Sequence, residues 1–331
     1  MTKESLLSIS PIDGRYKNKV KDLENYFSEF ALIKTRVEVE IRWLLFLLNI
    51  KSLNFLPRIN KNQKKKIESI FLNFNLKEAS KVKSIEKITN HDVKAVEVYI
   101  VKELDSVGLS KLSEFVHICC TSEDINNLSY ALMVERYRTE YLLPNLKSLN
   151  KEISKMAIKW ANISMLSFTH GQKASPTSVG KEFKNFFHRI SFLQNKINES
   201  KQSAKFNGAV GNFNAHHALD SDINWPNITK KFISSFNLGY SLISSQIEFK
   251  DNLVFLLSNI ENLNNVLIDL SKDIWLYISK DYLKQKISSS EVGSSTMPHK
   301  VNPIDFENAE GNLTLSNSLI PALKNKLQIS R

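Results

Sequence analysis

Three stretches of the chain place apolar residues at alternating steps of three and four, and this pattern constrains the fold more than any other feature. The longest covers residues 253–277, and two others cover 146–160 and 179–197. A helix with about 3.6 residues per turn puts such positions on one face. Stripes of this length need partner helices to cover them, so the sequence predicts a bundle of long helices. In the longest stretch the positions are Leu253, Leu256, Ile260, Leu263, Leu267, Leu270, Ile274 and Tyr277.

The first part of the chain is also expected to be helical. Apolar positions in residues 22–50 again step by three and four, which predicts a helix with one buried stripe. Glycine (9) and proline (8) are scarce, as expected of a helical rather than a turn-rich β protein. The expected fold class is therefore all-α. We expect a smaller helical N-terminal domain over residues 1–111 and a long-helix bundle domain over 112–331.

Charge and cysteine content bear on partners and compartment. The net charge is +11, but the lysine run at 61–66 lacks the aromatic residues and arginines typical of nucleic-acid sites. A lysine-rich surface, with no nucleic-acid partner, is therefore favoured. The longest purely apolar run, Trp43–Leu48, is too short to cross a membrane, and no signal-peptide pattern opens the sequence. Cys119 and Cys120 are adjacent, so a disulfide between them could not crosslink distant parts of the chain. A reducing, cytoplasmic location is therefore expected.

A polar segment at residues 288–312 stands out from the apolar periodicities. Asn302 is a good helix cap and Pro303 suits a first helical position, so the sequence predicts that a helix begins there. Asp305 and Glu307 then suit its first turn. A polar loop leading to a helix N-terminus is a natural anion site, although a capped surface loop is the simpler interpretation. The loop carries Gly293, Ser294, Ser295, Thr296, Pro298, His299 and Lys300.

Further polar clusters precede other helical patterns. Asn90-His91-Asp92 and Thr121-Ser122 each read as a helix start, and a cap without further function is the alternative for both. Arg15-Tyr16 follows a Pro-Asp-Gly turn. Thr169-His170-Gly171-Gln172 interrupts a helical pattern with a glycine and an imidazole, and residues 207–216 form a glycine-rich turn without the ending of a phosphate loop. No His or Cys pair has metal-ligand spacing, so no metal or cofactor is expected.

The segment from Gly293 to Pro303 resembles the signature loop of the fumarase/aspartase superfamily. His299 within it, together with Asn90-His91-Asp92 and the run Thr121–Asn127, resembles the adenylosuccinate lyases in particular. The resemblance implies a fumarase/aspartase-like helical bundle. It also implies β-elimination of fumarate from adenylosuccinate, giving AMP, and from the succinylated imidazole carboxamide nucleotide of purine biosynthesis. The expected assembly is a homotetramer whose active sites are shared between subunits.

The resemblance also assigns roles that the residues alone do not. Side-chain chemistry alone would nominate His170 and His299 for acid–base work, because imidazoles titrate near neutral pH. The resemblance keeps His170 as the general acid and gives the role of base to Ser294. It assigns substrate binding to Arg15, Tyr16, Asn90, His91, Asp92, Thr121, Ser122, Gln246, Ser295, Lys300, Val301, Asn302 and Asn308.

Two alternatives remain open at this point. Members of the family continue past the equivalent of Arg331 with an arginine-containing segment, a segment that binds the substrate phosphate and a third helical domain. A shortened chain that acts only as an oligomeric scaffold is therefore one alternative. The other is a sister lyase of the superfamily, such as an argininosuccinate lyase, which the Asn-His-Asp and Met-Pro-His-Lys motifs disfavour.

Overall fold

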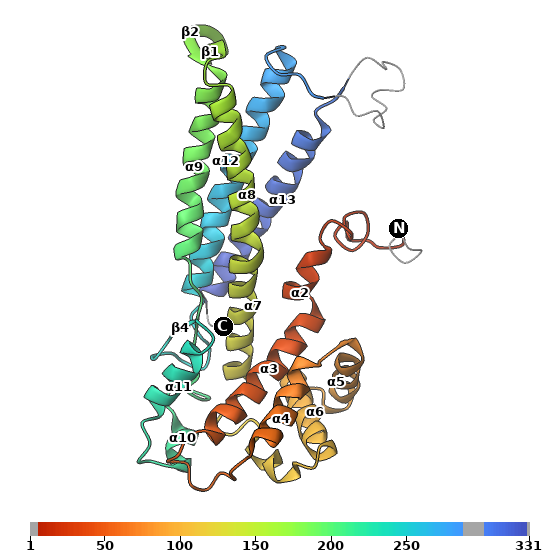
Figure 1. Cartoon of the computed structure of the whole chain (residues 1–331), viewed down its shortest axis with the longest axis vertical. Coiled ribbons are helices and arrows are strands. Elements are labelled where there is room, and N and C mark those ends of the chain that lie inside the picture. Colours follow the sequence, from red (N-terminus) through yellow and green to blue (C-terminus); the bar gives the residue numbers. More distant parts are fainter. Residues whose placement is uncertain (1–5, 287–300, 330–331) are drawn as a thin grey trace. The chain divides into compact units, whose positions relative to one another are not determined.

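The computed structural model describes residues 6–286 and 301–329 (Figure 1). The chain divides into two compact units, each built from two segments. Unit 1 comprises Met1–Tyr137 and Lys201–Phe249, and unit 2 comprises Arg138–Ser200 and Lys250–Arg331. The domain boundary predicted at residues 111/112 falls inside unit 1, because the chain leaves that unit only after residue 137 and returns to it at 201. A single boundary between two consecutive parts of the chain cannot describe units that are each built from two segments.

Unit 1 is organised around the long helix α3 (Glu29–Leu48), which begins where the Ser28 hydroxyl accepts a hydrogen bond from the Ala31 N–H. Its other helices are shorter, and its second segment contributes two short helices and a two-stranded parallel pair. In order, the remaining elements are η1 (Lys21–Leu23), α2 (Glu24–Phe27), α4 (Lys61–Leu72), α5 (Leu76–Thr89), α6 (Asp92–Ser106), η2 (Ser110–Phe115), α7 (Ser122–Arg136), β3 (Ser203–Ala204), α10 (Asn214–Leu219), α11 (Trp225–Ser234) and β4 (Gly239–Tyr240).

The core of unit 1 joins its two chain segments through aromatic rings. The ring of Trp43 on α3 lies 4.7 Å from Phe206 and 4.9 Å from Phe232, centroid to centroid, and all three side chains are buried. The indole N–H of Trp43 donates to the Ile118 carbonyl at 3.0 Å, so its one polar group is satisfied. Burial of such large rings adds to the apolar core that stabilises this unit.

Helix α3 differs from the predicted helix with one buried stripe. It buries almost its whole circumference, including charged side chains of Arg36, Glu38 and Glu40. The reason is that α3 is central to unit 1 and contacts other helices on several sides, α4, α6 and α7 among them. The polar positions that the pattern assigned to solvent are therefore inside the protein, where each needs a partner.

Unit 2 is a bundle of long helices, as predicted. A π-helical turn, η3 (Tyr137–Leu142), leads along the chain into α8 (Leu143–Lys159), and this is followed by α9 (Val179–Glu199), α12 (Asp251–Ser279) and α13 (Ile304–Leu327). Figure 1 shows these helices side by side, and α8 packs on α9, α9 on α12, and α12 on α13. The predicted stripe of α9 is confirmed, because every one of its apolar positions is buried: Val179, Phe183, Phe186, Ile190, Leu193 and Ile197.

An antiparallel hairpin connects α8 to α9, and the sequence pattern had indicated only a break between helices. Its strands are β1 (Ser164–Thr169) and β2 (Gln172–Ser178), with Thr169 paired to Gln172 across the turn and a register shift near Leu166–Phe168. The chain can return so tightly because Gly180 lets α9 approach the end of α8. A Cβ at Gly180 would lie 2.3 Å from the carbonyl oxygen of Ala157.

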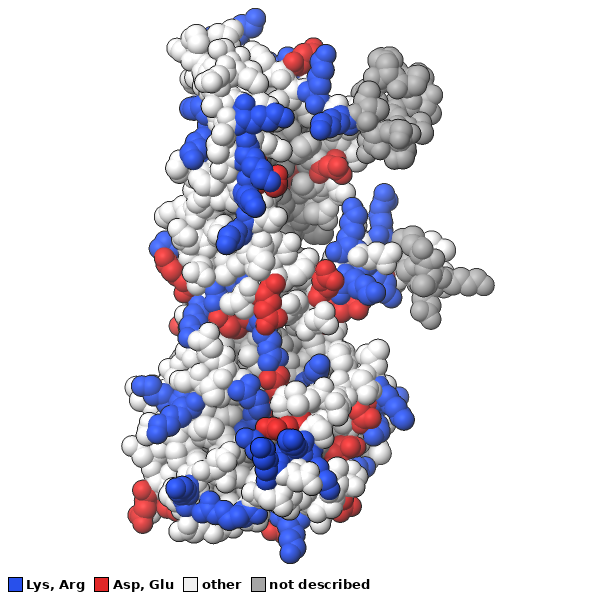
Figure 2. Space-filling view, viewed as in Figure 1, with Lys and Arg blue, Asp and Glu red and all other residues white. Residues whose placement is uncertain are grey.

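On the face of the surface that Figure 2 shows, the excess basic residues are spread out rather than gathered in one patch. In Figure 2, Lys and Arg side chains are scattered among acidic and neutral ones over this face. This distribution agrees with the lysine-rich surface inferred from the sequence. Among the described residues, no helix combines the length and apolar character that a membrane span requires.

Candidate functional site

The Asn90-His91-Asp92 motif forms the junction between α5 and α6. Asn90 has a left-handed backbone (φ 48°) that ends α5, and His91 caps α6 by accepting the Lys94 N–H at its Nδ1, 3.1 Å away. A ring nitrogen that accepts a hydrogen bond carries no proton, so this cap assigns the His91 proton to Nε2. The ring is half exposed. His91 therefore presents an N–H donor at a helix N-terminus, as suits an anionic ligand.

This junction opens into a polar pocket of about 580 Å³. The Lys83 ammonium on its wall is paired with two carboxylates, 2.6 Å from Glu86 and 3.0 Å from Glu29. The pocket is lined by Lys83, Glu86, Lys87, Asn90, His91 and Asp92. All three residues predicted from this motif thus line one cavity.

Arg36 of α3 joins this motif to the second predicted cluster. Its Nη2 donates to Asp92 Oδ2 at 2.6 Å, and its Nε donates to Asn126 Oδ1 at 2.8 Å. Asn126 lies in the first turns of α7, which starts directly after Thr121. Burial would raise the pKa of the Asp92 carboxyl, but the Arg36 charge and the Val93 N–H outweigh it and lower that pKa. Sequence reasoning missed Arg36, whose polar partners lie far away along the chain.

The start of α7 is held by the fully buried carboxylate of Asp124. It accepts the Thr121 N–H at 2.9 Å and the N–H groups of Asn207 and Gly208 at 3.2 Å each. It also pairs with the buried Lys205 ammonium at 2.8 Å. One side chain therefore fixes both the predicted Thr121-Ser122 motif and the glycine-rich loop. Thr121 and Asp124 also form a reciprocal capping box at the start of α7.

The glycine-rich loop in turn holds the segment that carries Gln246. The side-chain amide of Asn207 donates to the Ser244 hydroxyl at 2.9 Å and to the Leu242 carbonyl at 3.2 Å. Gly211 packs so closely on this segment that a Cβ would lie 2.1 Å from the Ser244 oxygen. Gln246 itself is exposed two residues further on. The structure thus links, within unit 1, the regions of Asp92, Thr121 and Gln246.

His117, which the sequence analysis left without a role, lies close to the same network. Its Nδ1 is 2.6 Å from Oε1 of the buried Glu40. Burial alone would lower the pKa of His117, but the hydrogen bond and charge of Glu40 overcome that effect and raise it. The other oxygen of Glu40 has no hydrogen-bond partner among the described residues. The Glu40 carboxylate thus favours the protonated form of His117.

Arg15 and Tyr16 lie in a run of turns near the start of unit 1. Backbone hydrogen bonds from Gly14 to Ser10 and from Tyr16 to Pro11 hold the turns, in agreement with the Pro-Asp-Gly pattern. Arg15 is exposed and Tyr16 is half-buried. Their part in substrate binding stays a prediction.

In unit 2, His170 occupies the tip of the β1–β2 hairpin. His170 (φ 53°) and Gly171 (φ 73°) both have left-handed backbones, which is the two-residue turn that suits the twist of a hairpin. The imidazole is exposed. The hairpin is anchored at Phe168, whose ring lies 6.0 Å from that of Tyr282 and 4.5 Å from the Lys280 ammonium. His170 is therefore presented on a short, fixed turn.

The described residues on either side of 287–300 contact each other in unit 2. The Gln285 side chain donates to the Val301 carbonyl at 3.3 Å. Helix α13 begins at Ile304 with Pro303 as its cap, one residue later than predicted from Asn302-Pro303. The difference is small because helix ends fray by one or two residues. Asp305 and Glu307 lie in its first turn as expected.

The remaining predicted residues of this region divide into two groups. Val301, Asn302 and Asn308 are partly exposed at the start of α13. Ser294, Ser295, His299 and Lys300 lie outside the described residues. Beside these elements, an apolar pocket of about 400 Å³ is lined by α8, α9, α12, residues 282–285 and Phe306.

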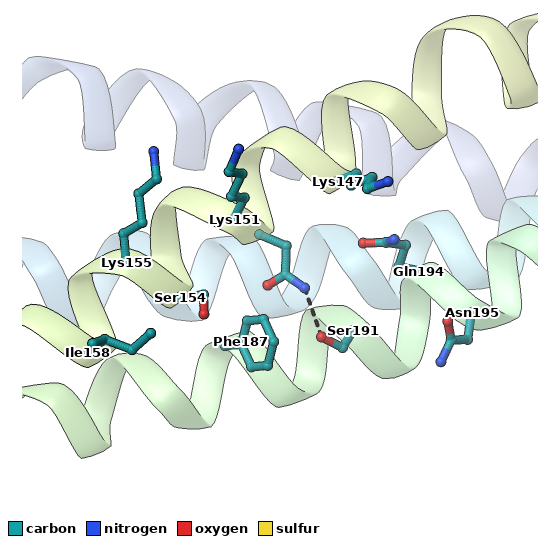
Figure 3. A pocket seen from close by; sticks show the side chains of 10 residues that line it. Lys147, Lys151, Ser154, Lys155, Ile158, Phe187, Ser191, Gln194 and Asn195 are labelled. Carbon is teal, nitrogen blue, oxygen red and sulfur yellow. Dashed lines mark hydrogen bonds between the residues drawn. The ribbon is translucent and has the colours of Figure 1, made fainter. Parts of the chain in front are cut away.

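A third pocket contains none of the predicted site residues. It has a volume of about 410 Å³ and lies between α8 and α9 (Figure 3). Lys147, Lys151 and Lys155 follow one edge of α8, and on its floor the Asn150 amide donates to the Ser191 hydroxyl at 2.8 Å. Within the described residues, no group of three His, Cys, Asp or Glu side chains could hold a metal ion.

Comparison with known proteins places this arrangement in a family. Residues 14–315 match the family model described as Lyase. The chain is 46% identical to the adenylosuccinate lyase of Buchnera aphidicola subsp. Schizaphis graminum over 332 residues, covering all of this chain and 73% of that protein. It is 42% identical to the Escherichia coli K12 adenylosuccinate lyase, with the same coverage.

Solved structures agree at the level of the fold. A 3-carboxy-cis,cis-muconate lactonizing enzyme from Pseudomonas putida superposes with a TM-score of 0.74 at 18% identity, covering 94% of this chain and 66% of that one. A fumarate lyase from Mesorhizobium sp. BNC1 gives 0.72 at 16% identity, with the same coverage. The chain therefore belongs to the lyase family and, within the fumarase/aspartase superfamily, to the adenylosuccinate lyases, which are carbon–nitrogen lyases.

Proposed function

We propose that the chain eliminates fumarate from adenylosuccinate, giving AMP, and from the succinylated imidazole carboxamide nucleotide, giving the free carboxamide nucleotide. The observation that carries this proposal is the 42–46% identity to adenylosuccinate lyases over the whole chain. The site geometry supports it. The pocket between α5 and α6 offers the His91 N–H donor, two lysines and a helix N-terminus, next to the carboxylates of Glu86 and Asp92. The donor groups suit a substrate rich in carboxylate and phosphate oxygens.

The chemistry requires a base, an acid and stabilisation of negative charge. A proton leaves the carbon next to a carboxylate, the carbon–nitrogen bond breaks, and its electron pair passes to the nitrogen, which takes up a proton. Charge builds on the carboxylate before the bond breaks, and placing donors and cations there is the largest demand. We assign that task to Lys300, Asn302 and the α13 N-terminus, with Ser295 and Asn308 contacting the substrate.

The proton transfers are assigned to His170 and Ser294. An exposed imidazole on a fixed turn can donate a proton to the departing nitrogen, which supports His170 as the acid. Ser294 is assigned the role of base by its place in the signature segment. A serine can act so only where water is excluded and positive charge surrounds its oxygen.

The remaining binding roles follow the two groups of residues in unit 1. Asn90, His91 and Asp92 line the pocket, and Arg36 links Asp92 to Asn126 of α7, the helix that begins at the proposed ligands Thr121 and Ser122. The other proposed substrate-binding residues are Arg15, Tyr16 and Gln246 in unit 1 and Val301 in unit 2. A cytoplasmic homotetramer with shared active sites is part of the proposal.

The test uses the purified chain with adenylosuccinate, following the fall in its ultraviolet absorbance, beside Ser294→Ala. Turnover that disappears in the variant supports the proposal. Turnover of argininosuccinate instead would assign the sister activity. A folded chain that turns over neither substrate would overturn the proposal and favour the scaffold alternative.

A further inference from the structure

We propose that Arg36 is a positioning residue of this active site. From the middle of α3, it sets the first turn of α6, and with it the Nε2–H of His91, against the start of α7. The inference rests on the proposed function, because the groups that it positions are the ones assigned to substrate binding. Arg36 itself touches no substrate in this assignment.

The geometry gives Arg36 two fixed directions. Its guanidinium donates through Nη2 to Asp92 at 2.6 Å and through Nε to Asn126 at 2.8 Å. A guanidinium is planar, so two bonds from different nitrogens of the same fork fix the angle as well as the distance between their acceptors. A lysine ammonium could reach one acceptor but could not hold this angle. Arg36 therefore works as a rigid bracket between α6 and α7.

The Arg36 side chain has little access to other hydrogen-bond partners. The Arg36 side chain is only 4% exposed, so water has little access to its donor nitrogens. The Arg36 charge and the Val93 N–H lower the pKa of Asp92 against the effect of burial, and a charged acceptor gives the stronger bond. Asp92 is fixed further by the Val93 N–H, 2.8 Å from its Oδ1. Both ends of the bracket are thus held in one orientation.

The location of the bracket argues for a role beyond stability. Helix α6 already packs into unit 1 through fully buried residues, including Val93, Val96 and Ile100. The Asp92 side chain, by contrast, is 44% exposed and lines the pocket. An ion pair at the mouth of a pocket adds little to packing that is complete beneath it. It does fix the residue next to His91, whose cap on α6 determines where the ring points.

The same helix supplies a matched control. Arg42 is also on α3 and also bridges distant parts of unit 1, with its guanidinium 3.6 Å from the Phe236 ring centroid and 3.2 Å from the Ser235 carbonyl. None of its contacts involves a predicted site residue. Arg42→Lys therefore removes a comparable arginine without touching the α6–α7 bracket.

The test measures kcat and KM for adenylosuccinate in Arg36→Lys, Arg36→Gln and Asn126→Ala. We expect kcat/KM to fall about 10- to 100-fold in the Arg36 variants, because a displacement of about 1 Å can cost this much. Arg42→Lys should stay within twofold. Asn126→Ala leaves the Arg36–Asp92 pair intact and should still lower kcat/KM, which keeps the test valid if Arg36→Gln folds poorly. A double variant, Arg36→Gln with Asp92→Asn, should be no slower than Asp92→Asn alone, since Arg36 acts through Asp92.

A second readout does not depend on turnover. In protein labelled with ¹⁵N-histidine, long-range ¹H–¹⁵N spectra report the His91 tautomer, and Arg36→Gln should change the Nε2–H form into a mixture. Folded Arg36 variants that keep kcat/KM within twofold, with an unchanged His91 spectrum, would overturn the inference. Absence of turnover in the unmodified chain would instead count against the proposed function, and the His91 spectra would still decide the role of Arg36.

Discussion

Asp124 and Lys205 form an ion pair at 2.8 Å in which neither side chain is exposed to solvent. The carboxylate also accepts three backbone N–H groups, and the ammonium donates to the Gly208 carbonyl at 2.8 Å. A buried pair with this many additional bonds holds its neighbours in one arrangement. The pair joins the two chain segments of unit 1 at the Thr121-Ser122 motif.

Removing one partner of this pair should destabilise unit 1 strongly. Asp124→Leu leaves the Lys205 ammonium buried without its counter-charge, which costs about 3–5 kcal/mol. Urea unfolding followed by circular dichroism measures the loss. The exposed pair Lys155–Glu152 is the matched control, because Lys155→Ala should cost less than about 1 kcal/mol. The double variant Asp124→Leu with Lys205→Met should be more stable than Asp124→Leu, and equal losses in both would contradict this account.

Gly211 should be far less tolerant of substitution than Gly108, although both have left-handed backbones (φ 81° and 75°). A Cβ at Gly108 meets nothing within 4 Å, so Gly108→Ala should cost only the backbone penalty of about 1–2 kcal/mol. At Gly211 the Cβ would collide with the Ser244 carbonyl, and the Ser244–Gln246 segment must move.

Thermal unfolding and kcat/KM for adenylosuccinate separate the two glycines. Gly211→Ala should lower both the unfolding temperature and kcat/KM, because the displaced segment carries the proposed substrate ligand Gln246. Gly108→Ala should lower the unfolding temperature alone. Equal kinetics for the two variants would show that Gln246 does not need this segment held in place.

The sequence predicts the long helices of unit 2 because apolar residues recur in them with the helical period, but Leu149 and Met156 of the stripe predicted for α8 are exposed. All predicted apolar positions of α9 are buried. It does not predict the hairpin between α8 and α9, since Thr169–Gln172 resembled a simple break and the strands lack a strong alternating pattern. Pro176 within β2 weakens the strand signal further.

The candidate site could be predicted only where its residues lie in contiguous motifs. Asn90-His91-Asp92 and Thr121-Ser122 could be recognised in this way, and Arg36 links Asp92 to Asn126 of the helix that begins at Thr121-Ser122. Arg36 and Glu40 could not be, because they occupy positions that a helical pattern assigns to solvent. Their partners, Asp92 and His117, are distant in sequence, and no local pattern encodes such pairs.

His216 should make unit 1 less stable in acid. It is fully buried against the rings of Phe213 and Trp225, and neither ring nitrogen has a hydrogen-bond partner among the described residues. Burial first, and then the charges of His217 and Lys205, lower its pKa to about 4. The unfolded state, with an ordinary pKa of about 6.5, binds the proton more readily. The contribution is therefore complete above about pH 6.5 and is lost as the pH falls toward 4, by about 3 kcal/mol.

Urea unfolding between pH 7.5 and 4.5 tests this, with His216→Phe as the comparison. The variant should lose less stability on acidification than the unmodified chain, because its ring has no proton to gain. The pKa of His117 is shifted in the opposite direction, so its contribution to stability has the opposite dependence on pH. Its raised pKa contributes stability below about pH 6.5 that disappears as the pH rises through the folded-state value, so His117→Gln should remove that part of the profile. Parallel profiles for His216→Phe and the unmodified chain would contradict the assignment.

His170→Asn should abolish most turnover without weakening the fold. The imidazole is exposed at the hairpin tip, so its removal loses little packing, and asparagine tolerates the left-handed backbone at φ 53°. Loss of a general acid typically slows a reaction by about 10²–10⁴-fold. We therefore expect kcat for adenylosuccinate to fall by this factor while the unfolding temperature stays unchanged. Lys173→Ala, at an exposed position of the same hairpin, should leave kcat within twofold. A His170→Asn protein that keeps its turnover would remove His170 from the mechanism, and the acid would then have to be sought among the other histidines.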